Sequence, residues 1–133
     1  MKKIFSLLLL LSLLVSLCSC GKYTSSYKAI GLIRSQTSHS CKASFHSLEG
    51  KLVFRIEKSK SGTEGDISYS ITVDEGEIRL YYDIYDTKNE LAHVKAGESV
   101  TAHGGYIESG HKVYIIIEAA EKTKGNVSVE LDN

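Results

Sequence analysis

The sequence contains no proline and no tryptophan, and its 133 residues include only three cysteines. It also has no low-complexity tract and no internal repeat, so nothing marks a division into several domains. Sixteen basic residues balance sixteen acidic ones, and no basic block occurs in the body of the chain. This balance argues against nucleic acid as a partner, because nucleic-acid-binding proteins need concentrated positive charge.

The signature motifs of several enzyme classes are missing as well. The chain has no Gly-x-Ser-x-Gly, no His-Glu-x-x-His, no phosphate-binding loop and no Cys-x-x-Cys. We therefore expect a protein that is not an enzyme and that needs no cofactor or metal.

The one long apolar run lies at the N-terminus. Lys2 and Lys3 precede the stretch from Ile4 to Leu17, which only three serines interrupt. A short positive region followed by an apolar run is the layout of a secretory signal peptide. The run has 14 residues, whereas a membrane-spanning helix needs roughly 20. A retained transmembrane helix is therefore the weaker interpretation.

The end of this run, Leu17-Cys18-Ser19-Cys20, resembles a bacterial lipoprotein signal. Such signals have an aliphatic residue at −3, a small residue at −1 and the lipid-bearing cysteine at +1. The rival frame, with Cys18 as acceptor, puts bulky Leu17 at −1. The resemblance implies a diacylglyceryl thioether on Cys20, whose two acyl chains anchor the protein to the extracytoplasmic face of a bacterial cell membrane. The alternative is an ordinary secretory signal with two incidental cysteines.

Cleavage before Cys20 would divide the chain into a signal peptide (residues 1–19), a lipidated N-terminus and tether (residues 20–27) and one domain (residues 28–133). Loss of Lys2 and Lys3 leaves 14 basic against 16 acidic residues, a formal charge of −2. Cys41 is then the only thiol, so no intramolecular disulfide can form. We expect Cys41 to be a small buried side chain in a strand, with an exposed thiol as the alternative.

Alternation of apolar and polar residues dominates the body of the chain and predicts half-buried strands. The clearest segments are 52–57, 67–73, 78–85, 113–119 and 127–131. Weaker strands are expected at 28–34, 42–48, 90–95 and 98–101. Asp86–Ala96 could instead form a short helix, because its residues have fair helix propensity.

Glycine-containing turn signals separate these segments, for example Glu49-Gly50 and Lys124-Gly125-Asn126. Short strands at this spacing predict an all-β, single-domain fold, an antiparallel β-sandwich or jelly-roll-like domain. Its expected core consists of Leu52, Phe54, Ile71, Val73, Ile78, Leu80, Ile115, Ile117, Val127 and Val129.

Two groups of residues invite a metal hypothesis. His39, Cys41 and His46 could ligate zinc or activate a thiolate, but strand alternation places His46 on the opposite face from the other two. Acidic side chains could hold calcium through oxygen ligands; these are Asp83 with Asp86, and Asp74, Glu75 and Glu77. A solvated strand end with a core cysteine explains the first group, and ordinary acidic turns explain the second, so we expect no metal site at either.

Tyrosines form the most suggestive pattern. If Ile78 and its alternates point inward, Tyr81 and Tyr85 point outward, and Tyr114 and Ile116 do the same on their own strand. Should the two strands be neighbours, an exposed aromatic patch results, and tyrosine rings can stack on sugars or anchor a protein partner. Cross-strand packing that only stabilises the sheet is the competing explanation.

Part of the body resembles known domains. The segments Tyr69–Val73, Glu77–Asp83, Val94–Glu98 and Gly105–Ile117 together resemble small lipoproteins of Gram-positive bacteria whose body is a β-sandwich. Ile107–Ile117 also looks like the closing hairpin of pre-peptidase C-terminal-type and related jelly-roll domains. The resemblance implies location and fold, and it transfers no catalytic residue.

Two functions are therefore expected to compete. The first is a non-enzymatic, membrane-anchored binding module for a glycan, a cell-wall component or a protein partner, with Tyr81, Tyr85 and Tyr114 as the ligand-binding residues. The second is a structural or inhibitory accessory lipoprotein without a small-molecule ligand.

Overall fold

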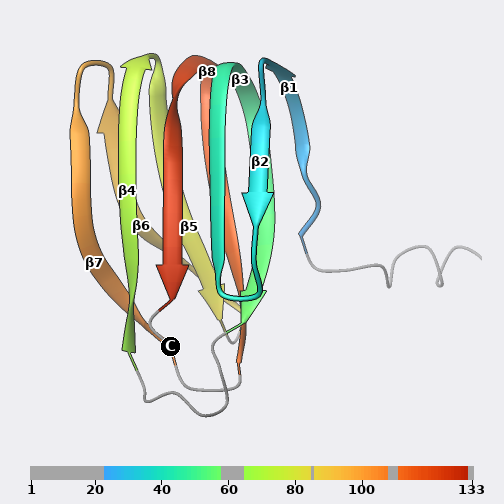
Figure 1. Ribbon diagram of the computed structural model, residues 1–133, viewed down its shortest axis with the longest axis vertical. Coiled ribbons are helices and arrows are strands. Elements are labelled where there is room, and N and C mark those ends of the chain that lie inside the picture. Colours follow the sequence, from blue (N-terminus) through green and yellow to red (C-terminus); the bar gives the residue numbers. More distant parts are fainter. Residues whose placement is uncertain (1–22, 58–64, 85, 108–110, 132–133) are drawn as a thin grey trace, which may run out of the picture.

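The computed structural model describes residues 23–57, 65–84, 86–107 and 111–131, and every regular element in these ranges is a strand. The eight strands are β1 (Ser26–Ile30), β2 (Ile33–Gln36), β3 (Ser40–Glu57), β4 (Gly65–Glu75), β5 (Glu77–Ile84), β6 (Thr87–Lys95), β7 (Ser99–Ile107) and β8 (Lys112–Leu131). All pairings between them are antiparallel (Figure 1). No membrane-spanning helix is found in the described ranges.

Two long strands, β3 and β8, each run through both layers of the molecule. The first part of β3 pairs with the last part of β8, from Ser40 opposite Glu130 to Phe45 opposite Gly125. The second part of β3 pairs with the first part of β8 down to Glu57 opposite Lys112. Register shifts between Phe45 and Gly50 separate the two parts, and both strands bend over at the same end of the molecule (Figure 1).

The bends produce two layers, which we call sheet I and sheet II. Sheet I contains β2, the first part of β3, the last part of β8, β4 and β7. Sheet II contains β1, the second part of β3, the first part of β8, β5 and β6. The expected antiparallel β-sandwich is confirmed. Its two layers are continuous through β3 and β8, because each of these strands bends and contributes to both sheets.

Glycines make the fold-over possible. Gly50 has φ of +119°, and a Cβ built there would stand 2.3 Å from the carbonyl oxygen of Ser26. A Cβ on Gly125 would stand 2.2 Å from the carbonyl oxygen of Thr72. Both glycines lie inside continuous strands, so the expected turns at these positions are wrong. The same residue type serves turns and close backbone contacts within a strand, and local sequence does not distinguish the two.

The space between the sheets is filled by apolar side chains that alternate along the strands. All ten residues expected in the core are buried, with at most 2% of their surface exposed. Leu48, Ile67, Val94, Ile107 and Val113 are buried with them. Burial on both inner faces fixes the register of each strand, because a one-residue slip would turn these side chains to solvent.

The weaker strands differ from expectation mainly at their ends. The expected strand at 28–34 is two strands, β1 and β2, which Gly31 separates with φ of +64°. Since β1 begins at Ser26, the last two residues of the segment assigned to the tether, residues 26 and 27, belong to a strand. Residues 87–95 form β6, so the helical alternative for Asp86–Ala96 is wrong.

Candidate functional site

The strands that carry the predicted tyrosines are neighbours. In sheet II, Tyr81 on β5 lies opposite Ile116 on β8, and Asp83 lies opposite Tyr114. Residues directly opposite each other share a face, so Tyr81 and Tyr114 lie one diagonal step apart on the face that points away from the core. We call it the outer face of sheet II. Tyr85 and Cys20 lie outside the described residues.

Register arranges this face in three rows that cross β3, β8 and β5. The row nearest the bend is Lys51, Glu118 and Arg79. The middle row is Val53, Ile116 and Tyr81, and the third is Arg55, Tyr114 and Asp83. The face therefore combines two tyrosine rings with side chains of both charges.

A short segment before β1, Tyr23–Ser25, continues along the edge of β3, and we call it the strap. The Tyr23 side chain extends from this edge over the outer face. The Tyr23 ring lies 5.2 Å from the Tyr114 ring between centroids, at an interplanar angle of 60°. Its hydroxyl donates a hydrogen bond to a carboxylate oxygen of Asp83. The Ser25 hydroxyl accepts a hydrogen bond from the backbone N–H of Val53 at 3.0 Å. The side chains of the strap therefore contact β3, β8 and β5.

Two side chains of the outer face, Ile116 and Asp83, are buried although they point away from the core. Ile116 was expected to be exposed, but its exposed fraction is 0%, although its register places it on the outer face beside Val53 and Tyr81. Asp83 in the third row is only 2% exposed. The prediction of an exposed Tyr/Ile patch is thus wrong for Ile116, and Tyr114 is half-buried. The alternation identified the face correctly, but it could not reveal that Tyr23 packs against it.

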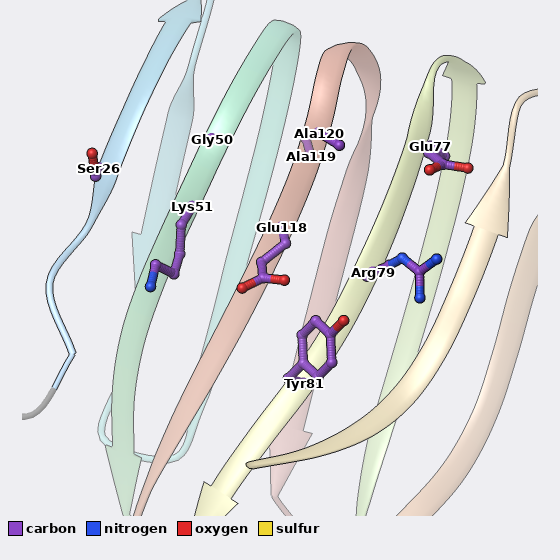
Figure 2. A pocket seen from close by; sticks show the side chains of 9 residues that line it. All are labelled: Ser26, Gly50, Lys51, Glu77, Arg79, Tyr81, Glu118, Ala119 and Ala120. Carbon is purple, nitrogen blue, oxygen red and sulfur yellow. The ribbon is translucent and has the colours of Figure 1, made fainter.

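Above the strap the face is hollowed into a groove of about 530 Å³. Figure 2 shows four of its lining side chains, Tyr81, Arg79, Glu118 and Lys51, which come from three different strands. The lining residues are Ser26, Gly50, Lys51, Glu77, Arg79, Tyr81, Glu118, Ala119 and Ala120. Of the two predicted tyrosines that the structure describes, Tyr81 lines this groove and Tyr114 does not.

Ion pairs hold the charged side chains at the groove rim. The Lys88 ammonium lies 2.8 Å from a carboxylate oxygen of Glu118 and 4.2 Å from the Tyr81 ring centroid. It thus reaches across β5 and covers part of that ring. Arg79 lies 3.4 Å from Glu90 on β6. These half-exposed pairs add little stability individually, but they fix the positions of hydrogen-bonding groups.

A further pair stands at the bend end of the groove, where Nε2 of His93 lies 3.1 Å from a carboxylate oxygen of Glu77. The hydrogen bond from His93 lowers the pKa of Glu77 below its usual value, and nearby positive charges reinforce the effect. Glu77 is therefore ionised at neutral pH, and its carboxylate can accept hydrogen bonds but cannot donate them.

Sequence reasoning did not single out Lys51, Arg79 and Glu118. Alternation does place Arg79 on the same face as Tyr81, and Glu118 on the same face as Tyr114. What the sequence lacked was the order β3, β8, β5, which sets these three residues in one row.

The outer face of sheet I has a different character. Cross-strand pairs of polar side chains connect β4 and β7: Ser68 with His103 at 3.0 Å, Ser70 with Thr101 at 3.2 Å, and Thr72 with Ser99 at 3.0 Å. Serine, threonine and histidine side chains that bond one another make this part of the outer face of sheet I polar.

The structure separates the residues of the zinc hypothesis. Cys41 is 2% exposed and belongs to the hydrophobic core cluster, whereas His46 is exposed. Burial raises the pKa of the Cys41 thiol to about 12, opposed in part by the charge of Arg34. A thiol held protonated is neither a nucleophile nor a zinc ligand. The expectation of a buried Cys41 is confirmed.

The acidic residues of the calcium hypothesis are also apart. Asp83 is buried against Tyr23 while Asp86 is exposed, and Glu77 is paired with His93. Across the described ranges, no three histidine, cysteine or acidic residues converge in a way that could hold a metal ion.

No protein-family model matches this chain, and no curated protein matches its sequence. Among solved structures, the chain is similar to a variant of the carbohydrate-binding module CBM29-2, with 12% identity over 80% of this chain and 77% of that chain and a TM-score of 0.43. A second CBM29-2 variant, complexed with mannohexaose, aligns with 12% identity over 81% and 89% and a TM-score of 0.40.

A cupin-2 domain protein from Shewanella frigidimarina NCIMB 400 aligns with 16% identity over 90% of this chain and 92% of that chain, with a TM-score of 0.34. Scores this low carry no argument about ligands, and the fold of this chain rests on its own strand pairings.

Proposed function

We propose that this domain binds a glycan in the groove on the outer face of sheet II, and that Cys20 anchors it by a lipid to the extracytoplasmic face of a bacterial membrane. The observation that carries the binding proposal is the groove itself. It is about 530 Å³ in volume and combines the Tyr81 ring with the charged ends of Arg79, Glu118 and Lys51.

This combination suits a sugar. A tyrosine ring packs against the apolar C–H face of a pyranose, and its hydroxyl remains available for hydrogen bonds. Carboxylates accept hydrogen bonds from sugar hydroxyls, and guanidinium and ammonium groups donate them. Because Lys88 covers part of the Tyr81 ring, a bound sugar would contact the remaining surface of the ring and its hydroxyl.

The anchoring proposal rests on Leu17, Ser19 and Cys20, which occupy the −3, −1 and +1 places of a lipoprotein signal. Two acyl chains give a stable anchor where one chain gives only marginal binding. Nothing in the sequence adds a second membrane signal, such as a polybasic patch.

A glycan array followed by calorimetry tests the binding proposal, using Tyr81→Ala and the matched control Tyr106→Ala. Tyr106 is exposed and belongs to β7 of sheet I. We expect Tyr81→Ala to weaken binding about fivefold or more, because loss of a stacked ring costs about 1 kcal/mol or more. We expect the control to bind like the original protein. Absence of any bound glycan, or equal loss in both variants, would contradict the proposal.

A second candidate function is that of an accessory lipoprotein without a small ligand. The covering of Tyr114 by Tyr23 favours it, because a ring used only for packing needs no access to solvent. On this alternative, the array stays empty, while Tyr23→Ala lowers the denaturation midpoint.

A further inference from the structure

We infer that the groove on the outer face of sheet II selects an acidic glycan, and that Lys51 pairs with a carboxylate or phosphate group of this ligand. The inference rests on the proposed glycan binding in the groove, and it adds the chemical class of the ligand. It follows from the ion pairs around the groove, from the position of Lys51 relative to the Tyr81 ring, and from the size of the groove.

Most of the charge that lines the groove is already balanced by β6. Three of the four charged lining side chains pair with residues of that strand: Glu118 with Lys88 at 2.8 Å, Arg79 with Glu90 at 3.4 Å, and Glu77 with His93 at 3.1 Å. Lys95 lies directly opposite Glu77 on β6 and adds a positive charge beside that carboxylate. The two carboxylates of the groove therefore do not make it negative.

Lys51 is the fourth charged lining residue, and its charge is not balanced in the same way. No ion pair joins its ammonium to a carboxylate of the described residues. Glu118 stands directly opposite it on β8, but the Glu118 carboxylate is held by Lys88. The Tyr23 ring, whose centroid lies 6.0 Å from the ammonium, carries no net charge. The end of the groove beside β3 therefore offers a positive charge to a ligand.

Register sets the distance between this charge and the Tyr81 ring. Lys51 lies two strands away from β5 and in the row of Arg79, and Tyr81 is two residues further along β5. With strands about 4.8 Å apart and a rise of about 3.4 Å per residue, the Cα atoms of Lys51 and Tyr81 are roughly 12 Å apart. Both residues line the same groove of about 530 Å³, and Figure 2 shows the Glu118 side chain between them.

This separation determines the length of the ligand. One pyranose ring is too small to contact both side chains, so the ligand is a disaccharide or longer. One of its sugar rings lies against Tyr81, and the acidic group of another unit lies at Lys51. A hydrogen bond between two charged groups is roughly twice as strong as one between neutral groups. Since Lys51 is half-buried, solvent and salt screen such a pair less than they would on an open surface.

Calorimetry with matched saccharides tests the inference. Tetragalacturonate is compared with its methyl ester, which has the same rings without the charge, and a mannose tetrasaccharide is compared with its 6-phosphate. We expect the acidic member of at least one pair to bind about fivefold more tightly or better. Raising the ionic strength from about 0.01 M to about 1 M should reduce this ratio, because the Debye length falls from roughly 30 Å to roughly 3 Å. The two pairs distinguish a carboxylate ligand from a phosphate ligand.

Variants of two lysines on β3 assign the preference to a residue. Lys51→Met keeps the apolar stem and removes the charge, so it should bring the ratio of acidic to neutral affinity close to one. Lys51→Arg should retain the preference. Lys42→Met is the matched control, because Lys42 is exposed and pairs with Ser128 in sheet I, and it should behave like the original protein. A preference that survives Lys51→Met would overturn the inference.

The neutral saccharides separate this inference from the proposal beneath it. If they bind, Tyr81→Ala weakens them and the acidic members bind no more tightly, the acidic preference is wrong and the glycan groove stands. If neither these pairs nor any member of the glycan array binds, the proposed function and the acidic preference are overturned together.

Discussion

Burial keeps the Cys41 thiol protonated well beyond its usual pH range. The side chain is 2% exposed and belongs to the core between the sheets, and burial raises its pKa from 9.0 to about 12. In the unfolded chain the thiol is in water and ionises near its ordinary pKa. The folded state therefore loses stability as the pH rises through this window, because only the unfolded state releases the proton.

This difference predicts the effect of Cys41→Ala. Below about pH 9 the variant should be less stable than the original protein by a constant amount, because a small cavity replaces the sulfur. Between pH 9 and 11 the original protein should lose stability relative to the variant by ~1.4 kcal/mol per pH unit. Urea unfolding at several pH values measures both. A difference that stays constant up to pH 11 would show that the thiol titrates normally in the folded state.

Tyr23 shows how far one side chain can change the character of a face. Its ring packs on Tyr114, its hydroxyl bonds Asp83, and the Lys51 ammonium lies 6.0 Å from its ring centroid. These contacts cover part of the Tyr114 ring and the carboxylate of Asp83 on the outer face of sheet II. They leave Tyr81 as the tyrosine that lines the groove.

Among the elements, β3 and β8 decide the architecture because each belongs to both sheets. The fold-over in β3 depends on Gly50, where the backbone of β1 comes too close to admit a side chain. Gly97 also has a positive φ, +83°, but no atom lies within 4 Å of a Cβ built there. Substitution of Gly97 therefore measures the free-energy cost of backbone strain alone. Substitution of Gly50 adds the cost of a steric clash between the new side chain and the backbone of β1.

We expect Gly97→Ala to cost about 1–2 kcal/mol of unfolding free energy, since it forces an alanine into a left-handed conformation. Gly50→Ala should cost at least about 2 kcal/mol more, because the new methyl group must also displace the backbone of Ser26. Equilibrium urea unfolding measures both variants. Similar losses would mean that the bend can shift to admit a methyl group.

The second part of β3 has an edge that β1 covers only as far as Lys51. Beyond it, side chains satisfy the strand's outward backbone groups: Arg34 donates to the carbonyl of Val53 at 3.4 Å and Gln36 donates to the carbonyl of Arg55 at 2.6 Å. An exposed edge would otherwise be a template for pairing with another chain. Polar residues on β2 thus protect the edge and leave the face of sheet II available for binding.

For the whole molecule, the proposed lipid anchor at Cys20 would set where the groove can act. We predict that Cys20→Ser releases the protein from membranes, because the serine hydroxyl cannot form the thioether. Cys18→Ser is the matched control and should remain membrane-bound, since Leu17 is too bulky for the −1 place of the rival frame. Cell fractionation with labelled fatty acid measures both. Release by Cys18→Ser with retention of Cys20→Ser would assign the anchor to the other cysteine.

The sequence by itself determined the class of fold and the composition of the core. Alternating apolar residues identified the strands, and the ten residues expected in the core are all buried, because a period of two admits only one inward-facing set. It also identified which side chains share a face on each strand, including Tyr81 with Arg79 and Tyr114 with Glu118.

Only the tertiary structure decided which strands are neighbours, where the sheet folds over and what covers the tyrosines. Strand order depends on contacts between residues far apart in the chain, such as Tyr81 with Ile116, and no local pattern encodes them. The residues around Gly50 and Gly125 resemble those of glycine-containing turns, although both glycines lie in strands. The strap, read from the sequence as a polar tether, packs on sheet II because the fold supplies Tyr114 and Asp83 as partners for Tyr23.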